Sequence, residues 1–300
     1  MIIMEIDGIK DKIEKADYII IGAGAGLSLA AGLDYNGERF KRNFREYIEK
    51  YNIQDMYSGG FYPFKTLEEK WGYWAKHLSV EINEKGTEVY RNLLKLVEDK
   101  DYFVITTNVD EQFQKAGFPE NKIYETQGRY SRLQCSVPCC NRLYDANPYI
   151  EGMLENIDED LKVPSEFVPR CPVCGEPLDT NLRGSDRFVE DEWWHIQNRA
   201  YHRFLDNAKG SRTVLLEFGI GYNTPTIIRF PFDSLTINSP NWDLVRFNKD
   251  NFEVSVNMGD SFKLVPLGFL DDFDLGDNFS IRYFPVCEDV DVILRKLLGL

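Results

Sequence analysis

Residues 18–28 read Tyr-Ile-Ile-Ile-Gly-Ala-Gly-Ala-Gly-Leu-Ser, an apolar run that leads directly into a glycine-rich stretch. The run predicts a buried β-strand, and the residues from Leu27 onward predict the first turns of a helix. Gly22, Gly24 and Gly26 would let backbone N–H groups approach a phosphate beside the positive end of the helix dipole. The alternative is a tight strand–helix turn that needs glycine for its own backbone. The segment therefore predicts an anion-binding loop or a close-packed turn at the end of a strand.

Helices and buried strands alternate along the rest of the chain. This alternation predicts an α/β fold, a Rossmann-like parallel sheet domain with two excursions. The first excursion, residues 35–84, has aromatic residues at helical spacing and is expected to be an inserted helical module. The second, residues 131–184, carries closely spaced cysteines and is expected to be a small zinc-binding module. Residues 1–34, 85–130 and 185–300 then form the sheet domain.

A dehydrogenase of the common dinucleotide-binding type is disfavoured. Leu27 occupies the place of the third glycine in the G-x-G-x-x-G pattern, and no second strand ending in an acidic residue follows. A helix with Phe40 and Phe44 at helical spacing comes instead. The expected helices are 7–15, 27–31, 37–50, 67–78, 89–98, 191–208 and 290–298, and the expected strands are 18–21, 102–107, 213–218, 244–247 and 262–266.

The composition limits the possible functions. Of the 300 residues 43% are hydrophobic and 14% aromatic, enough for a sizeable core, and the formal net charge is −14. Sequence-independent nucleic-acid binding needs a basic surface, so we expect neither nucleic acid nor a membrane as partner. No apolar stretch has the length of a membrane span, and no opening stretch resembles a secretion signal. We therefore expect a cytoplasmic protein, in which paired cysteines are metal ligands more often than disulfides.

The cysteine spacing predicts a structural zinc site. In Cys171-Pro-Val-Cys-Gly175 two thiolates can grip one ion while the glycine permits the tight turn. Unrelated buried thiols are the alternative, which suits Cys287 better than this knuckle. Spacing leaves Cys139 and Cys140 both open, and we prefer Cys139. Four thiolates leave no open coordination position, so the zinc should support the fold and not the reaction. The expected ligands are Cys135, Cys139, Cys171 and Cys174.

Taken with the glycine loop, the residues that follow it resemble the NAD-cleaving core of the sirtuins. Residues 22–36 are similar to the family's glycine loop, its serine, and a glycine-hydrophobic-proline-aspartate-phenylalanine-arginine run. Asp34 matches the aspartate, whereas Tyr35 replaces the phenylalanine and Asn36 replaces the arginine. Arg39, shortly after, is a candidate to supply the missing guanidinium.

Two later segments extend the resemblance. Thr106-Thr-Asn-Val-Asp110 is similar to the family's threonine-glutamine-asparagine-isoleucine-aspartate motif, with Thr107 in place of the glutamine. Gly219-Ile-Gly-Tyr-Asn-Thr-Pro225 follows a buried strand where sirtuins hold the adenosine half of NAD. Asn248 resembles the asparagine that binds the adenosine ribose, although a strand-end turn residue is an alternative reading. The resemblance implies NAD as cofactor, bound by Gly22, Ala23, Gly24, Gly26, Ser28, Asp34, Tyr35, Arg39, Thr107, Asn108, Asp110, Gln127, Gly219, Gly221, Asn223 and Asn248.

Gln127 stands before Gly128, where sirtuins have their general-base histidine. A glutamine cannot accept a proton at any useful pH, and such a base typically contributes about 10²–10⁴-fold to the rate, so deacylation should be crippled. Cleavage of the nicotinamide–ribose bond passes through an oxocarbenium-like state whose leaving group already carries positive charge. Because a carboxylate acceptor needs no deprotonation, transfer of ADP-ribose to it survives the loss of the base.

The motifs together look like those of the microbial class M sirtuins, a branch linked to macrodomain proteins. This resemblance implies a protein mono-ADP-ribosyltransferase in which Asn108 and Asp110 position the ribose and stabilise charge while Gln127 orients the acceptor. The implied partners are a protein acceptor, such as a lipoylated glycine-cleavage-H-like carrier, and a separate macrodomain protein that removes the mark.

Three alternative functions stay open. The first is an NAD glycohydrolase with water as acceptor, the second a catalytically silent NAD or ADP-ribose sensor, and the third a residual NAD-dependent deacylase. His77, His195 and His202 lie outside the position of the missing base and are expected to be structural or surface residues.

Overall fold

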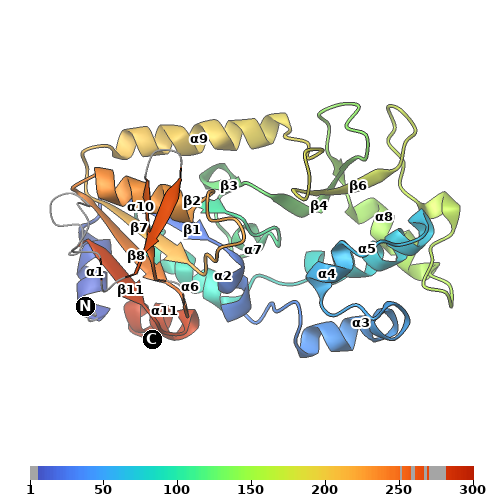
Figure 1. Ribbon diagram of the computed structural model, residues 1–300, viewed down its shortest axis with the longest axis horizontal. Helices are drawn as coiled ribbons and strands as arrows, with labels where there is room; N and C mark the ends of the chain where they lie inside the picture. The colour runs from blue at the N-terminus through green and yellow to red at the C-terminus, as the bar shows by residue number, and fades with distance from the viewer. Residues whose placement is uncertain (1–5, 251, 258–260, 267–268, 270–281) are drawn as a thin grey trace.

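The computed structural model describes residues 6–250, 252–257, 261–266, 269 and 282–300; the expected domain segments 1–34 and 185–300 extend beyond these described residues. Its centre is a six-stranded sheet in the order β11-β8-β7-β1-β2-β3, with every neighbouring pair parallel (Figure 1). The expected α/β fold with a parallel sheet is confirmed. The strands are β1 (Tyr18–Ala23), β2 (Asp101–Thr106), β3 (Ile123–Glu125), β7 (Thr213–Phe218), β8 (Trp242–Phe247) and β11 (Tyr283–Val286).

Helices cover both faces of this sheet, which is why its central strands β1 and β7 are buried along almost their whole length. In β1, Ile19 and Ile21 point into one core and Ile20 into the other. The first face packs against α1 (Ile6–Lys15), α2 (Ala25–Ala30), α6 (Glu88–Val97), α7 (Gln112–Lys115) and α11 (Val290–Leu298). The second packs against α9 (Glu192–Ala208) and α10 (Arg229–Asn238).

The two excursions form a second part of the molecule, on the right in Figure 1. They share one hydrophobic core, in which Phe44 and Tyr73 of the first excursion meet Met153 and Leu178 of the second. Their elements are α3 (Glu38–Tyr51), α4 (Met56–Gly60), α5 (Leu67–Ile82), α8 (Asn147–Glu155) and an antiparallel sheet of β4 (Gly128–Cys135), β5 (Tyr144–Asp145) and β6 (Leu178–Leu182). Short 3-10 helices span Glu120–Lys122 and Ser165–Phe167. The exact domain limits stay a prediction.

One expected strand lies outside the parallel sheet. Phe262–Val265 is strand β10, which pairs antiparallel with β9 (Val254–Asn257) in a separate hairpin. Its side chains at Phe262 and Leu264 are exposed, so its apolar sequence does not mark a central strand. The sequence analysis missed β3 and β11, the strands at the two edges of the sheet. Among the described residues no helix is long and apolar enough to cross a membrane.

Candidate active site

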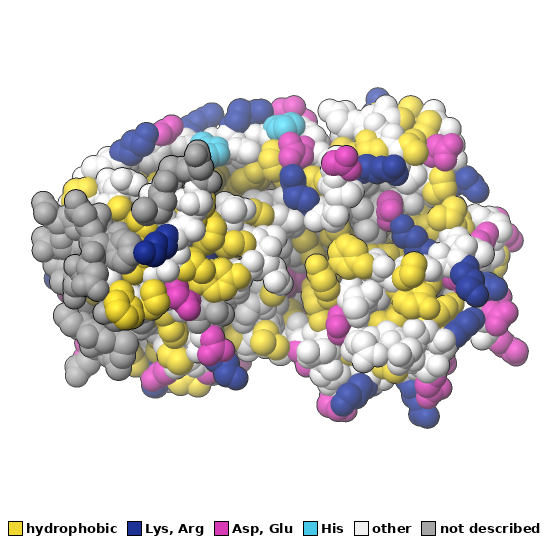
Figure 2. Space-filling model, viewed as in Figure 1, with side chains coloured by type: hydrophobic (Ala, Val, Ile, Leu, Met, Phe, Trp, Pro, Cys, Tyr) yellow, Lys and Arg dark blue, Asp and Glu magenta, His cyan; other side chains and the backbone are white. Residues whose placement is uncertain are grey.

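The glycine loop, the Asn108–Asp110 motif and the loop from Gly219 follow directly on the ends of parallel strands. Backbone contacts join these ends: Thr107 N–H donates to the Ala23 carbonyl (3.0 Å), and Gly219 N–H donates to the Phe247 carbonyl (2.9 Å). Figure 2 shows the surface hollowed between the two parts of the molecule, with hydrophobic side chains exposed in the hollow. The carboxyl ends of a parallel sheet are the usual place for a ligand site in α/β folds.

The glycine loop is packed tightly against the loop after β7. A Cβ atom on Gly26 would lie 2.5 Å from the Gly219 Cα, and a Cβ on Gly219 would lie 2.4 Å from the Gly26 Cα. Gly26 N–H also donates to the Gly219 carbonyl (3.0 Å), and Gly219 has φ of +59°. A Cβ on Gly22 would meet Ile228 and Phe232 at 2.6 Å. The close-packed-turn reading of these glycines therefore holds, and it is compatible with a ligand on the outer side.

A buried polar cluster lies under this loop. Asn108 Nδ2 donates to the Gly24 carbonyl (2.9 Å), to Ser28 Oγ (3.1 Å) and to Tyr90 Oη (3.2 Å). Ser28 Oγ donates to Asp110 Oδ2 at 2.5 Å. The structure thus brings Ser28, Asn108 and Asp110 together, as the motifs predict, and adds the hydroxyl of Tyr90.

The cluster places Asp110 in an environment that disfavours its charge. Burial raises the pKa of Asp110 above its ordinary value, while hydrogen bonds from Ser28 and the Gln112 N–H act in the opposite direction. Lys115 Nζ donates to the Asp110 carbonyl oxygen at 2.7 Å. A carboxylate held in this way can respond strongly to positive charge that develops beside it.

The residue after Asp110 adopts a strained backbone conformation. Glu111 has φ of +58°, which costs a non-glycine residue on the order of 1–3 kcal/mol. Its carboxylate accepts hydrogen bonds from the Ser131 N–H (3.1 Å) and Oγ (2.7 Å). These contacts hold the turn that aims Asp110 into the cluster.

Tyr35 and Arg39, two further predicted residues, meet the second part of the molecule. Tyr35 Oη lies 2.9 Å from Tyr130 Oη, and the Tyr130 N–H donates to the Val109 carbonyl (3.0 Å), between Asn108 and Asp110. The Arg39 guanidinium is buried and donates to Glu81 Oε1 (2.8 Å). The structure thus gives Arg39 a buried carboxylate partner within the helical module.

Asp34 and Asn223 lie at the edges of the site. Asp34 packs against Gly37, where an added Cβ would collide with its carboxylate. Asn223 is exposed, and Gly221 faces open space. Asn248 Nδ2 donates to the Ile220 carbonyl at 2.9 Å, which ties the end of β8 to the loop.

Gln127 lines a cavity of about 500 Å³ between the ends of β2 and β3 and the helices α9 and α10. The backbone carbonyl of Gln127 accepts a hydrogen bond from the backbone N–H of Arg183 (3.0 Å). The Arg183 guanidinium lies in the same wall, where it stacks on Phe188 (4.3 Å) and pairs with Glu190 (2.5 Å). His202 also lines this cavity.

His77 lies elsewhere, within the aromatic core of the helical module. It is buried, stacks on Trp74 at 4.9 Å, and burial lowers its pKa to about 3. A structural role, as expected from the sequence, fits this environment.

The four predicted metal ligands meet at one point. The Sγ atoms of Cys135, Cys139, Cys171 and Cys174 lie within 4.8 Å of one another. The Cys135–Cys174 pair is 3.5 Å apart and the Cys139–Cys171 pair 3.6 Å, close to the ~3.8 Å edge of a tetrahedron with zinc–sulfur bonds of ~2.3 Å. Cys139 belongs to this group and Cys140 does not, which supports the preference for Cys139. The donor set fits a structural zinc ion.

Several residues of the site escaped the sequence analysis. Tyr90 is hydrogen-bonded to Asn108, Tyr130 is hydrogen-bonded to Tyr35, and Arg183 lines the cavity. The sequence around each of them predicts only a helix or a strand. Glu125 and Arg129 form a buried ion pair (2.5 Å) beside a second cavity of about 270 Å³. The spacing of Tyr90 from Asn108 is set by a helix-to-strand connection, so only the folded chain shows their contact.

Known proteins share both the sequence and the fold. A protein ADP-ribosyltransferase of Staphylococcus aureus is 34% identical over 248 residues, 82% of this chain and 78% of that protein. A probable bifunctional ADP-ribose hydrolase/ADP-ribosyltransferase of Fusarium oxysporum is 32% identical over 77% of this chain, which matches only 40% of that longer protein. An NAD-dependent protein deacetylase of Listeria innocua is 27% identical over 49% of this chain and 60% of that protein. No family model matches the chain.

Solved structures with low sequence identity show the same fold. A Sir2 homolog in complex with NAD has a TM-score of 0.59 at 14% identity and covers 98% of this chain and 92% of its own. A sirtuin studied for substrate affinity has a TM-score of 0.58 at 19% identity, with 99% of both chains covered.

Proposed function

This chain belongs to the sirtuin family, and on that premise we propose that it is an NAD-dependent protein mono-ADP-ribosyltransferase. The two relatives above 30% identity are named as ADP-ribosyltransferases, whereas the deacetylase of Listeria innocua matches at 27% over about half the chain. The observation that carries the proposal is Gln127, an amide at the position where the resembling sirtuin motif has its proton acceptor. The site keeps the groups for cleaving NAD and lacks the base for deacylation.

The proposed reaction breaks one bond and forms one. The bond between ribose C1′ and nicotinamide breaks, and its electron pair leaves with neutral nicotinamide. Asp110 and Asn108 stabilise and orient the cationic ribose. An acceptor carboxylate, oriented by the Gln127 amide, then attacks C1′ and forms an ester. No proton needs to move, which suits an amide at position 127.

The proposal extends to the cofactor, metal and partners. NAD would lie along the loops of Gly22–Ser28 and Gly219–Asn223, with Asn248 toward the adenosine ribose. The four cysteines would bind the structural zinc ion. The acceptor would be a protein, with a lipoylated glycine-cleavage-H-like carrier as the specific candidate. A separate macrodomain protein would remove the modification, in the cytoplasm.

Labelled NAD tests this function. The protein is incubated with NAD labelled in the adenine, with and without the lipoylated carrier, and both nicotinamide and label are followed. We expect label on the carrier, lost in Asn108→Ala and kept in Asn92→Ala. Asn92 is a matched control because it is fully buried and its side chain has no hydrogen-bond partner within the described part of the chain.

The alternatives give different products. Nicotinamide with only free labelled ADP-ribose would indicate a glycohydrolase. NAD binding without nicotinamide release would indicate a sensor, and release that depends on an acylated peptide would indicate a residual deacylase.

A further inference from the structure

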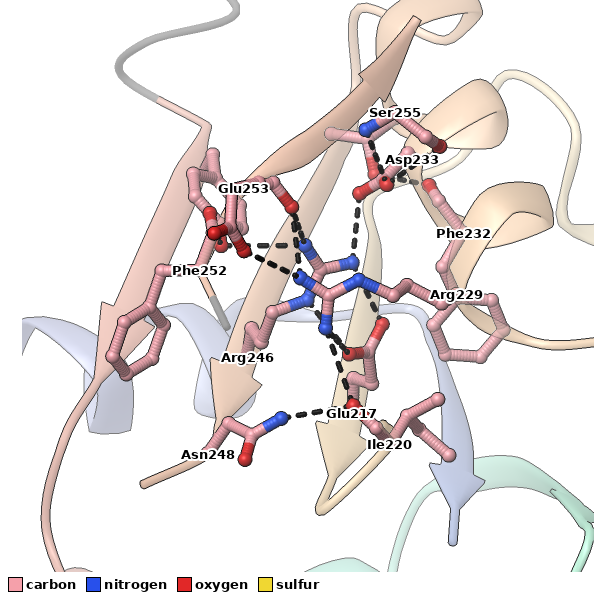
Figure 3. A network of polar contacts seen from close by, with 12 residues as sticks. Glu217, Ile220, Arg229, Phe232, Asp233, Arg246, Asn248, Phe252, Glu253 and Ser255 are labelled. Atoms are coloured by element: carbon pink, nitrogen blue, oxygen red, sulfur yellow. Dashed lines mark hydrogen bonds and ion pairs between the residues drawn. The ribbon is translucent and has the colours of Figure 1, made fainter. Parts of the chain in front are cut away.

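Four charged side chains with no exposed surface lie together behind the loop that follows β7 (Figure 3). Arg246 forms a two-pronged pair with Glu217, with Nε–Oε1 at 2.7 Å and Nη2–Oε2 at 2.8 Å, and Nη2 also reaches Asp233 Oδ1 at 2.7 Å. Arg229 Nη1 lies 3.7 Å from Glu217 Oε1. Two arginines face two carboxylates, so the charges within this buried network balance.

Burying four charges is costly unless every one is paired, and apolar residues of similar volume often serve stability as well. Stability alone therefore does not explain why the network is ionic. Its position offers a reason, because its members come from β7, α10 and β8, the elements that surround the Gly219–Asn223 loop.

Arg229 connects this network directly to the loop. Its Nη1 donates to the Ile220 carbonyl (3.2 Å), and its guanidinium lies 4.5 Å from the centre of the Tyr222 ring. Its Nη2 donates to the Glu253 carbonyl (2.9 Å), and the Glu253 carboxylate accepts from Tyr222 Oη (2.7 Å). One side chain thus holds the loop at two points and ties it to the residues before β9.

The Ile220 carbonyl is the decisive contact. It accepts hydrogen bonds from both Arg229 and Asn248, so it points into the protein. In a trans peptide the carbonyl and the following N–H point in opposite directions, and no described peptide bond is cis. The Gly221 N–H is therefore directed outward, where Gly221 faces open space.

We propose that Arg229 is a positioning residue for the cofactor: it fixes the Ile220–Gly221 peptide so that the Gly221 N–H faces the adenosine half of NAD. This inference rests on the proposed function, since it takes NAD as the ligand of the loop. Arg229 acts through the loop and not on a phosphate, because it is fully buried and its charge is met by Glu217. Arg229 therefore contributes the orientation of the Ile220–Gly221 peptide and not only a positive charge.

Arg229→Lys tests this role because it keeps the charge and removes the forked donor. We expect the KM and the Kd for NAD to rise about tenfold, the effect of losing one charge-assisted hydrogen bond, with kcat within about twofold. Tyr222→Phe removes only the hydroxyl that ties the loop to Glu253, and should raise both constants by a smaller factor while the protein stays folded.

Tyr47→Phe is the matched control for Tyr222→Phe. It removes a buried hydroxyl that donates to the Gly72 carbonyl (2.8 Å) in the helical module, so NAD binding should be unchanged. Each Kd is measured by calorimetry on the full chain, with circular dichroism to confirm folding.

The outcomes separate the inference from the proposed function. A wild-type chain that binds no NAD overturns both. A wild-type chain that binds NAD, with Arg229→Lys and Tyr222→Phe both folded and binding equally well, overturns only the role of Arg229. A lower Tm in Arg229→Lys without a change in KM would likewise assign the network to stability alone.

Discussion

Ser28 Oγ donates a hydrogen bond of 2.5 Å to Asp110 Oδ2, although the two residues are 82 positions apart in the sequence. This contact joins the first glycine loop to the motif after β2. It is also a donor that favours the ionised form of a carboxyl whose pKa burial raises.

Replacing Ser28 with alanine is expected to raise the pKa of Asp110 further, because the donor that favours its charge is lost. If ionised Asp110 stabilises the cationic ribose, nicotinamide release rises with pH on the acid side, and Ser28→Ala shifts that rise to higher pH. The measurement is the pH profile of nicotinamide release, with Ser211→Ala as control. An unchanged pH profile would show that Ser28 does not influence the group that titrates.

Gly26→Ala is expected to destabilise the fold by about 1–3 kcal/mol or more, because the new Cβ meets backbone atoms that cannot move aside. Gly221→Ala should stay within about 0.5 kcal/mol of wild type, since no atom lies within 4 Å of the added carbon. Urea unfolding of the two variants checks this. Equal stabilities would contradict the close approach of Gly26 and Gly219.

Removal of one zinc ligand should disrupt the second part of the molecule. Cys174→Ser is expected to lose the metal, and a loss of ~3 kcal/mol would lower Tm by roughly 6–12 °C. Cys140→Ser should keep one equivalent of zinc, because Cys140 stands outside the ligand group. Metal analysis and thermal unfolding give the answer, and metal loss in Cys140→Ser would reverse the ligand assignment.

Glu125 should make stability depend on pH. Burial raises its pKa to about 7, although Arg129 beside it acts to lower it. The folded state therefore holds the proton more tightly, so this contribution to stability is complete below about pH 4.5 and is lost as the pH rises through 7, by up to roughly 3 kcal/mol.

The free energies of unfolding of wild type and Glu125→Gln at pH 5 and pH 8 test this dependence. The free energy of unfolding of the variant should increase relative to that of wild type as the pH rises. Glu120→Gln is the control, since Glu120 is exposed and faces the same arginine at 3.8 Å. A constant difference between wild type and Glu125→Gln would show that Glu125 does not titrate in this range.

Gln127→Ala is expected to lower transfer to the carrier about tenfold, the value of one lost orienting hydrogen bond, with nicotinamide release less affected. His202→Ala removes the imidazole that lines the same cavity and should leave transfer within about twofold. Loss of transfer in His202→Ala and not in Gln127→Ala would make the histidine the working group. Both activities are followed with the same labelled NAD.

Much of the fold was predictable because its signals are local. An apolar run predicts the strand at 18–21, and β1 is Tyr18–Ala23. The cysteine spacing predicts the knuckle at 171–175, and Cys171 and Cys174 lie together with Cys135 and Cys139. Strands β3 and β11 were missed because both are short and lie at the sheet edges. Strand β10 was misplaced because the apolar residues Phe262 and Leu264, which are exposed, look in sequence like part of a buried strand.

The site was predictable only where a motif carries it. Asn108 and Asp110 follow from their motif, whereas Tyr90 enters through a helix packed on the sheet. The ion pair of Arg39 with Glu81, 42 residues later, was not predictable in this way. Partners of buried charges are chosen by packing, which one sequence does not display.

The core shared by the two excursions has a consequence during synthesis on the ribosome. Helix α5 ends at Ile82, but its core is completed by residues up to Leu178. At 5–20 residues per second, the intervening stretch of about 100 residues takes roughly 5–20 s to emerge. Throughout that time the aromatic core in which Phe44 of α3 packs on Tyr73 of α5 lacks the residues of the second excursion, which makes the nascent chain a client for chaperones. Zinc scarcity would prolong this vulnerable interval, so the yield of folded protein should depend on the metal supply of the cell.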